Sequence, residues 1–236
     1  MKNYILIAAC VLCSCTVFAK KVKFAVNMSA TPVDTGGVHI AGDFQAVAGY
    51  PGGDWVTSST AMIQELADTN IYSVVVDIPA FACYQFKFVN GIHGYNQEFV
   101  PLESRVNYNF LDNRWILIDS MANDTQLVGP IMYGANAPIG KYLMRLYVDM
   151  QLVSSVSANG AHVGGTFQNW NPATTRLHSF DGNVYEYIAY VDTGINAFQH
   201  EYKFANGNTT GDYEAIPGWC VNLNNNRQTT VPKDTM

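Results

Sequence analysis

The sequence predicts an all-β protein made of two tandem antiparallel β-sandwiches. Three observations support this fold class. Apolar and polar residues alternate along many short segments, aromatic residues (13%) are nearly as frequent as charged residues (14%), and most of the first half recurs in the second. With 236 residues, 48% of them hydrophobic, the chain is long enough to build two cores of ordinary domain size.

Each predicted strand turns one apolar face toward a core. In the segment 22–28, Val22, Phe24 and Val26 lie on one face and Lys23 on the other, and segments 72–78 and 144–150 alternate in the same way. Short strands separated by Gly, Asn and Pro turns are typical of a sandwich with six to eight strands in two sheets. The largest core residues are expected to be Phe44 and Phe88 in the first unit and Phe167 and Phe204 in the second.

An internal repeat divides the chain. Five groups of residues recur in the same order, with spacings that shift by only a few residues, which indicates two related units. The units are predicted to be residues 20–120 and 143–236, joined by a Gly- and Pro-containing linker at 121–142. The matching segments are VKFAVNM (22–28) with MRLYVDM (144–150), VHIAGDFQ (38–45) with AHVGGTFQ (161–168), DTNIYSVVVDI (68–78) with DGNVYEYIAYV (181–191), YQFKFVNG (84–91) with FQHEYKFANGN (198–208), and Glu98 with Asn113-Arg114 against Glu214 with Asn226-Arg227.

The N-terminus has the pattern of an export signal. Lys2 precedes the apolar run YILIAACVLC, and Ala19 ends a small-residue exit sequence, so residues 1–19 are predicted to be a cleaved signal peptide. The segment LCSC leaves open a lipoprotein anchored at Cys15. Either route predicts a secreted, periplasmic or cell-surface protein, and no later segment is apolar and long enough for a transmembrane helix.

Charge and cysteine content exclude several functions. The net charge is −6, and no Lys/Arg cluster is present, so nucleic acid and anionic membrane surfaces are not expected partners. Cys83 and Cys220 follow the signal peptide. We interpret them as two buried free thiols, and a disulfide between them, which export permits, is the alternative. No metal or cofactor motif and no nucleophile–base motif occurs, and two sandwiches leave little chain for a pair of catalytic carboxylates. We therefore expect no enzyme activity.

A lysine lies between aromatic residues in one strand of each unit. Lys87 and Lys203 alternate with the aromatic core face, so both should project from the outer face. Trp55 and Trp170 lie in loops that follow a Phe-Gln strand end in each unit. Aromatic rings stack on the C–H face of a pyranose ring, while Lys and amide groups hydrogen-bond its hydroxyls, so the pattern predicts a weak sugar-binding surface.

The motifs GTFQNWNP (165–172) and FQHEYKF with NNNRQTTVP (198–232) resemble starch-binding domains of carbohydrate-binding families 20 and 48, including glycogen-recognition domains. The resemblance covers most of both units through short matches, and it implies immunoglobulin-like sandwiches that bind an α-glucan. It implies a second-unit site of Trp170, Lys203 and Trp219. In the first unit it implies Trp55 and Lys87, with Tyr95 or Phe99 replacing the unmatched second aromatic.

An alternative function is a cell-surface structural or adhesion protein whose sandwiches contact other surface proteins, because this fold serves both roles. The Asn-Arg pairs and the two matching glutamates, Glu98 and Glu214, are interpreted as structural, through turns or ion pairs.

Overall fold

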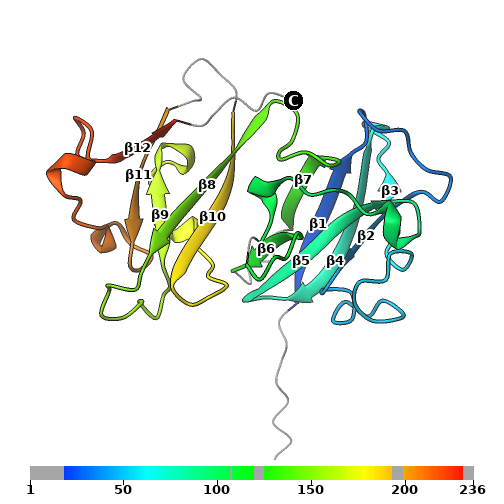
Figure 1. The fold of residues 1–236 in the computed structure, drawn as a ribbon, viewed down its shortest axis with the longest axis horizontal. Coiled ribbons are helices and arrows are strands. Elements are labelled where there is room, and N and C mark those ends of the chain that lie inside the picture. Colours follow the sequence, from blue (N-terminus) through cyan, green and yellow to red (C-terminus); the bar gives the residue numbers. More distant parts are fainter. Residues whose placement is uncertain (1–18, 107, 120–124, 193–198, 231–236) are drawn as a thin grey trace, which may run out of the picture.

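The structure is a computed structural model that describes residues 19–106, 108–119, 125–192 and 199–230. Figure 1 shows two β-rich halves side by side, the first coloured blue to green and the second green to red. The signal peptide, apart from Ala19, and the lipidation candidate Cys15 lie outside the described residues, so both stay predictions.

The first half contains two sheets. The order of strands is β3-β4-β1-β7 in one sheet and β2-β5-β6 in the other. The strands are β1 (Ala19–Asn27), β2 (Val38–Gly42), β3 (Ile63–Gln64), β4 (Ile71–Pro79), β5 (Ala82–Asn90), β6 (Arg114–Ile118) and β7 (Gln126–Met132). Two 3-10 turns, η1 (Gly94–Asn96) and η2 (Leu102–Ser104), lie between β5 and β6.

The second half repeats the order of strand pairing. The β8–β10 pair corresponds to β1–β4, and the sheet β9-β11-β12 corresponds to β2-β5-β6. Its strands are β8 (Lys141–Asp149), β9 (His162–Gly165), β10 (Val184–Asp192), β11 (Gln199–Ala205) and β12 (Arg227–Thr230). Its 3-10 turns are η3 (Thr166–Gln168), η4 (Pro172–Thr174), η5 (Thr210–Asp212) and η6 (Gly218–Cys220). The described part of this half has five strands, fewer than the six to eight expected.

Part of the expected linker is a strand. Residues 126–132 form β7, which pairs in parallel with β1, so the first sheet is mixed rather than wholly antiparallel. The register shifts between Phe24 and Val26, opposite the Gly129-Pro130 step, because proline cannot donate to the ladder. The apolar residues Val128 and Ile131 are buried in the core of the first half. The Gly and Pro content of this segment therefore marks an irregular strand.

A separate apolar core fills each half. In the first half, buried residues from β1 and β4 face those from β2 and β5. Phe24 stacks on Phe44 and meets Phe86 edge to face. The cluster of the second half draws on β8, β9, β10 and β11. The predicted core residues Phe44, Phe88 and Phe204 are buried, whereas Phe167 is half-buried at the edge of its cluster.

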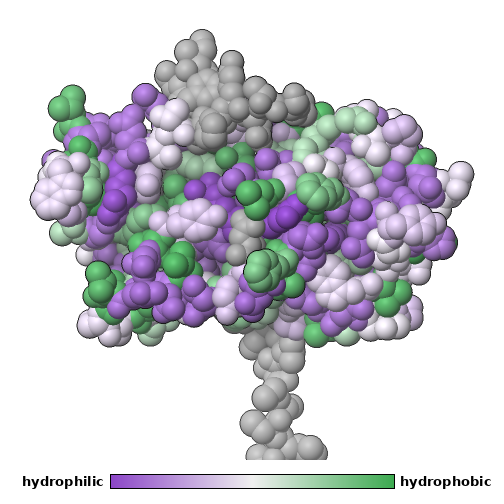
Figure 2. Space-filling view, viewed as in Figure 1, coloured by the Kyte–Doolittle hydropathy of each residue, from purple (hydrophilic) through white to green (hydrophobic). Residues whose placement is uncertain are grey.

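The regular elements of the described residues are strands and three-residue 3-10 turns, so the predicted all-β class is confirmed. Its division into two immunoglobulin-like sandwiches stays a prediction. No helix among the described residues is long and apolar enough to cross a membrane. On the face drawn in Figure 2, apolar residues form small patches separated by polar ones.

Candidate functional site

The two tryptophan loops are built in the same way. The backbone N–H of Trp55 donates to the carbonyl of Gly42 at 3.1 Å, and that of Trp170 donates to Gly165 at 2.9 Å. Both tryptophans have a left-handed backbone, with φ of 62° and 58°. This conformation is unfavourable for a bulky residue, so it persists only where neighbouring contacts hold the loop.

A glutamine side chain supplies those contacts in each loop. Oε1 of Gln45 accepts from the Val56 N–H at 2.9 Å, and its Nε2 donates to the Thr60 hydroxyl at 2.8 Å. Oε1 of Gln168 accepts from the Asn171 N–H at 2.7 Å, and its Nε2 donates to the Asn171 carbonyl at 2.7 Å. Satisfied polar networks of this kind rigidify a loop. The Phe-Gln motif thus fixes the segment that carries each tryptophan.

In the second half, Trp170, Tyr213 and Lys203 lie on one face of the sheet. The Tyr213 hydroxyl donates to the Trp170 carbonyl at 3.1 Å, and the two rings meet edge to face with centroids 6.3 Å apart. Tyr213 covers Gly164, because a Cβ at that position would lie 1.8 Å from the Tyr213 hydroxyl. Gly164 is the cross-strand partner of Lys203, and such partners share a face.

Tyr213 was missed from the sequence, which instead predicts Trp219 as the second aromatic of this site. Among the described residues, the aromatic partner of Trp170 is Tyr213. Burial raises the pKa of Tyr213, so its phenol keeps its proton and donates to the Trp170 carbonyl. Trp219 lies in η6 and is 88% exposed. The sequence does carry a signal for Tyr213. It directly precedes Glu214, just as Gln97 directly precedes the matching Glu98 in the first unit.

The first half does not repeat this constellation. Nζ of Lys87 forms an ion pair with Asp112 at 2.8 Å, and the Lys87 side chain is only 10% exposed. A partner carboxylate therefore holds Lys87 against the protein, a contact that the sequence did not predict. Ala41 stands opposite Lys87, and Gln97 occupies the bridge position that Tyr213 has in the second half. Trp55 is half-buried without a matching tyrosine beside it.

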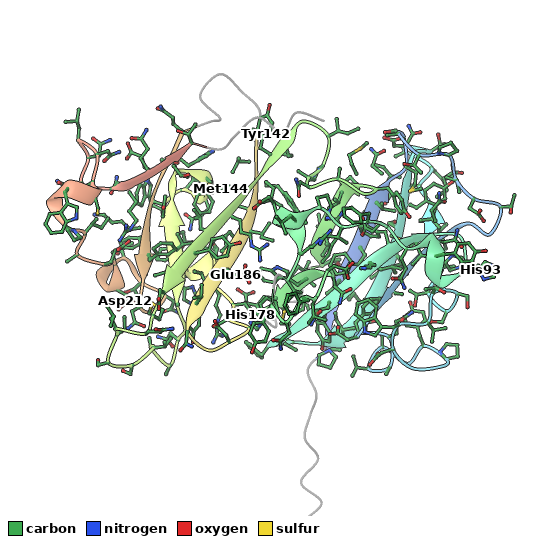
Figure 3. The ribbon with its side chains drawn as sticks, in the orientation of Figure 1. His93, Tyr142, Met144, His178, Glu186 and Asp212 are labelled. Atoms are coloured by element: carbon green, nitrogen blue, oxygen red, sulfur yellow. The ribbon has the colours of Figure 1, made fainter. Side chains whose placement is uncertain are left out.

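The substitute aromatics of the first half are exposed. Tyr95 is 83% exposed and stacks on His93 with centroids 5.1 Å apart, and Figure 3 places His93 on the side of this half that faces away from the second half. Phe99 is 76% exposed, and the Arg105 guanidinium lies 4.7 Å from its ring centroid. The exposed aromatic residues of the first half thus form one aromatic pair, Tyr95 with His93, and one cation–aromatic pair, Phe99 with Arg105. Lys87 is not available as a donor beside them.

The matching acidic and basic residues form ion pairs, as predicted. Glu98 contacts Nε and Nη2 of Arg114 at 2.8 and 2.7 Å, and Glu214 contacts the same atoms of Arg227 at 2.8 and 2.6 Å. Each glutamate also accepts from a backbone N–H of the lysine-bearing strand, at 3.0 Å in both halves. These residues therefore anchor β5 and β11 and have a structural role.

The two cysteines are free thiols, so the disulfide alternative is not realised. Cys83 is half-buried and Cys220 is exposed, which corrects the expectation that both would be buried. Among the described residues, no group of three or more His, Cys, Asp or Glu side chains is arranged to hold a metal ion.

Comparison with known proteins gives distant structural likenesses. No protein-family model and no curated protein matches the chain. The structure is similar to a glycoside hydrolase family 15 glucoamylase from Hypocrea jecorina, with a TM-score of 0.34 and 13% identity; the match covers 50% of this chain but only 18% of that one. It is also similar to the family CBM26 module CBMbc of Eubacterium rectale Amy13K in complex with maltoheptaose, with a TM-score of 0.30, 12% identity, and coverage of 89% and 87% of the two chains. Both likenesses are too distant to define what this chain does.

Proposed function

We propose that the protein is an exported, non-catalytic carbohydrate-binding protein that binds an α-glucan through its second half. The observation that supports this most is the grouping of Trp170, Tyr213 and Lys203 on one face of the β9–β11 sheet. Trp219, exposed on η6, is proposed to add a second stacking surface. We also propose that residues 20–120 and 143–236 are duplicated sandwich units, of which the second carries the site.

The chemistry of these side chains suits a sugar polymer. The indole and phenol rings offer apolar faces for the C–H groups of a pyranose ring, and Lys203 offers donors for hydroxyl oxygens. Fully burying one aromatic side chain contributes about 1.5–3 kcal/mol, whereas association costs several kcal/mol. A site built on two rings and one amine should therefore bind a short glucan weakly. A polymer with many equivalent positions compensates by multivalent contact.

The first half is proposed to make a smaller contribution. The ion pair with Asp112 occupies Lys87, and Trp55 has Gln97 rather than tyrosine on the neighbouring strand. Tyr95 remains the candidate aromatic there, outside the Trp55 loop. This asymmetry supplies a matched control within one molecule, because Trp55 and Trp170 share their loop geometry but not their neighbours.

Affinity electrophoresis of the purified protein in gels containing amylopectin or glycogen tests the proposal. We expect retardation of the wild type, its loss in Trp170→Ala, and little change in Trp55→Ala. Thermal unfolding of both variants confirms that each is folded. Equal loss in the two variants would place the site elsewhere, and a wild type that no α-glucan retards would refute α-glucan binding and favour the protein-contact alternative.

A further inference from the structure

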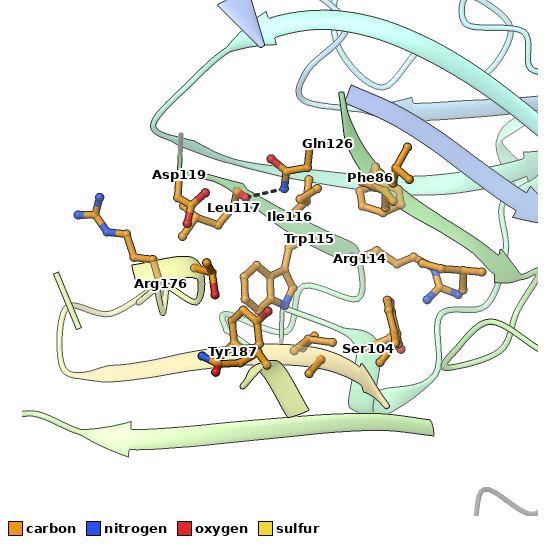
Figure 4. Close-up of a pocket in the computed structure, with 18 of the residues that line it drawn as sticks. Phe86, Ser104, Arg114, Trp115, Ile116, Leu117, Asp119, Gln126, Arg176 and Tyr187 are labelled. Carbon is orange, nitrogen blue, oxygen red and sulfur yellow. Dashed lines mark hydrogen bonds between the residues drawn. The ribbon is translucent and has the colours of Figure 1, made fainter. Parts of the chain in front are cut away.

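A cavity of about 410 Å³ lies between the two halves. Its walls come from β6 and β7 of the first half and from the β9–η4 segment and β10 of the second. In Figure 4 the Trp115 indole stands in the middle of the cavity with Tyr187 beside it, Asp119 and Arg176 lie toward one end, and Arg114 lies toward the other. The volume falls in the range of small-molecule sites, roughly 300–1,000 Å³.

Contacts between the halves fix the walls of this cavity. The Trp115 ring meets Phe180 at a perpendicular angle with centroids 5.5 Å apart and lies 5.9 Å from His178. Figure 3 places His178 at the junction of the two halves. Nη1 of Arg145 also donates to the Glu103 carbonyl at 2.9 Å. The Trp115 indole, carried by β6 of the first half, thus packs against two aromatic side chains of the second half, which restricts the position of its ring.

Two donors in the cavity lining have no acceptor. Nε1 of Trp115 and Nη1 of Arg114 are buried, and neither atom has a hydrogen-bond partner within the described structure. Most buried polar atoms in proteins are paired, and an unpaired one costs about 1–3 kcal/mol. The Arg114 guanidinium packs on Glu98 and Phe88, which do not line the cavity, so the Trp115 N–H is the unpaired donor that favours a ligand with oxygen acceptors there.

The charges around the cavity balance. Arg114 is neutralised by its bidentate pair with Glu98. Arg176 and Asp119 both line the cavity, and no hydrogen bond or ion pair engages either side chain within the described residues. Tyr187 stays a neutral phenol, because burial and then Asp119 raise its pKa. A lining with aromatic faces, free donors, a free carboxylate and no net charge suits a neutral ligand rich in hydroxyl groups.

We propose that this cavity binds a neutral sugar of one or two rings, stacked on Trp115 and Tyr187 and hydrogen-bonded to Trp115 Nε1, Asp119 and Arg176. Sugar hydroxyls both donate and accept, so a sugar can pair with a carboxylate and with an indole N–H at the same time. This site is separate from the outer surface that carries Trp170, and it does not depend on polymer binding there.

Saturation-transfer NMR titration of the full protein with glucose, galactose, maltose, lactose and glucuronate tests the proposal. We expect at least one neutral sugar to bind, and Trp115→Phe, which keeps an aromatic ring but removes the donor, to weaken it about 3- to 10-fold. Asp119→Asn should weaken it by a similar factor and decides the matter if Trp115→Phe does not fold. Leu66→Ala, at a fully exposed position outside both proposed sites, is the control and should bind the sugar as the wild type does. Trp170→Ala reports whether the outer surface contributes to the measured binding.

The outcomes separate the two sites. Loss of sugar binding in Trp170→Ala, with no effect of the folded Trp115→Phe or of Asp119→Asn, would assign binding to the outer surface and overturn the cavity proposal. Absence of binding by every neutral sugar at millimolar concentration, or binding of glucuronate alone, would overturn it as well. Binding that survives Trp170→Ala but falls in the cavity variants would support it even if no gel containing glucan retards the protein.

Discussion

The substitution Gly164→Ala should disable the outer surface of the second half without unfolding it. An added Cβ would lie 1.8 Å from the Tyr213 hydroxyl and 2.7 Å from Cζ, whereas ordinary van der Waals contact begins at 3.4 Å. The obstructing atoms belong to the end of a side chain, so the Tyr213 ring moves rather than the strand. Ala41 stands at the matching position opposite Lys87, which indicates that this strand position tolerates alanine.

The size of the effect follows from the contacts that position Tyr213. Moving the ring breaks the 3.1 Å hydrogen bond to the Trp170 carbonyl, which contributes about 0.5–1.5 kcal/mol. It also removes the edge-to-face contact with the indole, which contributes another 0.5–1.5 kcal/mol, roughly. A glucan that requires both rings in place therefore loses up to about 1–3 kcal/mol, or about 5- to 150-fold in affinity.

Affinity electrophoresis over a series of amylopectin concentrations measures this loss. Gly94→Ala is the matched control, because a Cβ there meets no atom within 4 Å and the backbone is not left-handed. We expect Gly94→Ala to bind as the wild type does and Gly164→Ala to migrate almost as in a gel without polymer. Unchanged retardation of Gly164→Ala, with a thermal unfolding curve like that of the wild type, would refute the role given to Tyr213.

Three further predictions concern stability and reactivity. Glu98→Ala removes one partner of a fully buried ion pair and should lower the free energy of unfolding, measured in urea, by about 3–5 kcal/mol. Glu214→Ala, in a pair that is 23–31% exposed, should lower it by about 1 kcal/mol. Equal losses would contradict the difference in burial between the two pairs. A thiol reagent should modify exposed Cys220 in the native protein but Cys83 only after unfolding, because burial raises the pKa of Cys83; mass spectrometry of the two peptides checks this. The hydrogen bond from Lys87 lowers the pKa of Asp112 in the folded protein. The ionised carboxylate therefore stabilises the fold above the pKa of Asp112 in the unfolded chain, and this stabilisation is lost as the pH falls through the pKa in the folded protein. Below about pH 4, Asp112→Asn should therefore lose less stability than the wild type.

Most of the fold was predicted from the alternation of apolar and polar residues and from the internal repeat of the sequence. The strands around Phe24, Phe88 and Met144 were expected from period-two patterns, because a sheet with one buried face imposes that period on its sequence. Strand β7 was not expected, because the Gly129-Pro130 step is typical of loops. Its pairing depends on a contact with β1 roughly a hundred residues away, and local composition does not encode that contact.

Individual site residues were harder to predict than strands. The sequence places Lys87 and Lys203 at equivalent positions, yet within the part of the chain that the structure describes only Lys87 meets a carboxylate. Asp112 supplies it from the segment before β6. Tyr213 was overlooked because its importance depends on the glycine beneath it, on a strand nearly fifty residues earlier in the chain. Pattern reasoning identifies which face a side chain takes, whereas the partners on that face come from other strands and loops.

The differences between the two halves are coupled, which is why we propose the outer binding surface for the second half only. Gly164 makes room for Tyr213, and Tyr213 in turn supports the neighbouring indole. In the first half Ala41 fills that room, Gln97 replaces the tyrosine, and Asp112 draws the lysine into an ion pair. Changing Ala41 alone to glycine would open a gap with no ring to fill it, and removing Asp112 alone would free an amine with no aromatic surface beside it. Only a change at all three positions would give the first half the surface proposed for the second, so the proposed difference in binding rests on a set of contacts and not on any single residue.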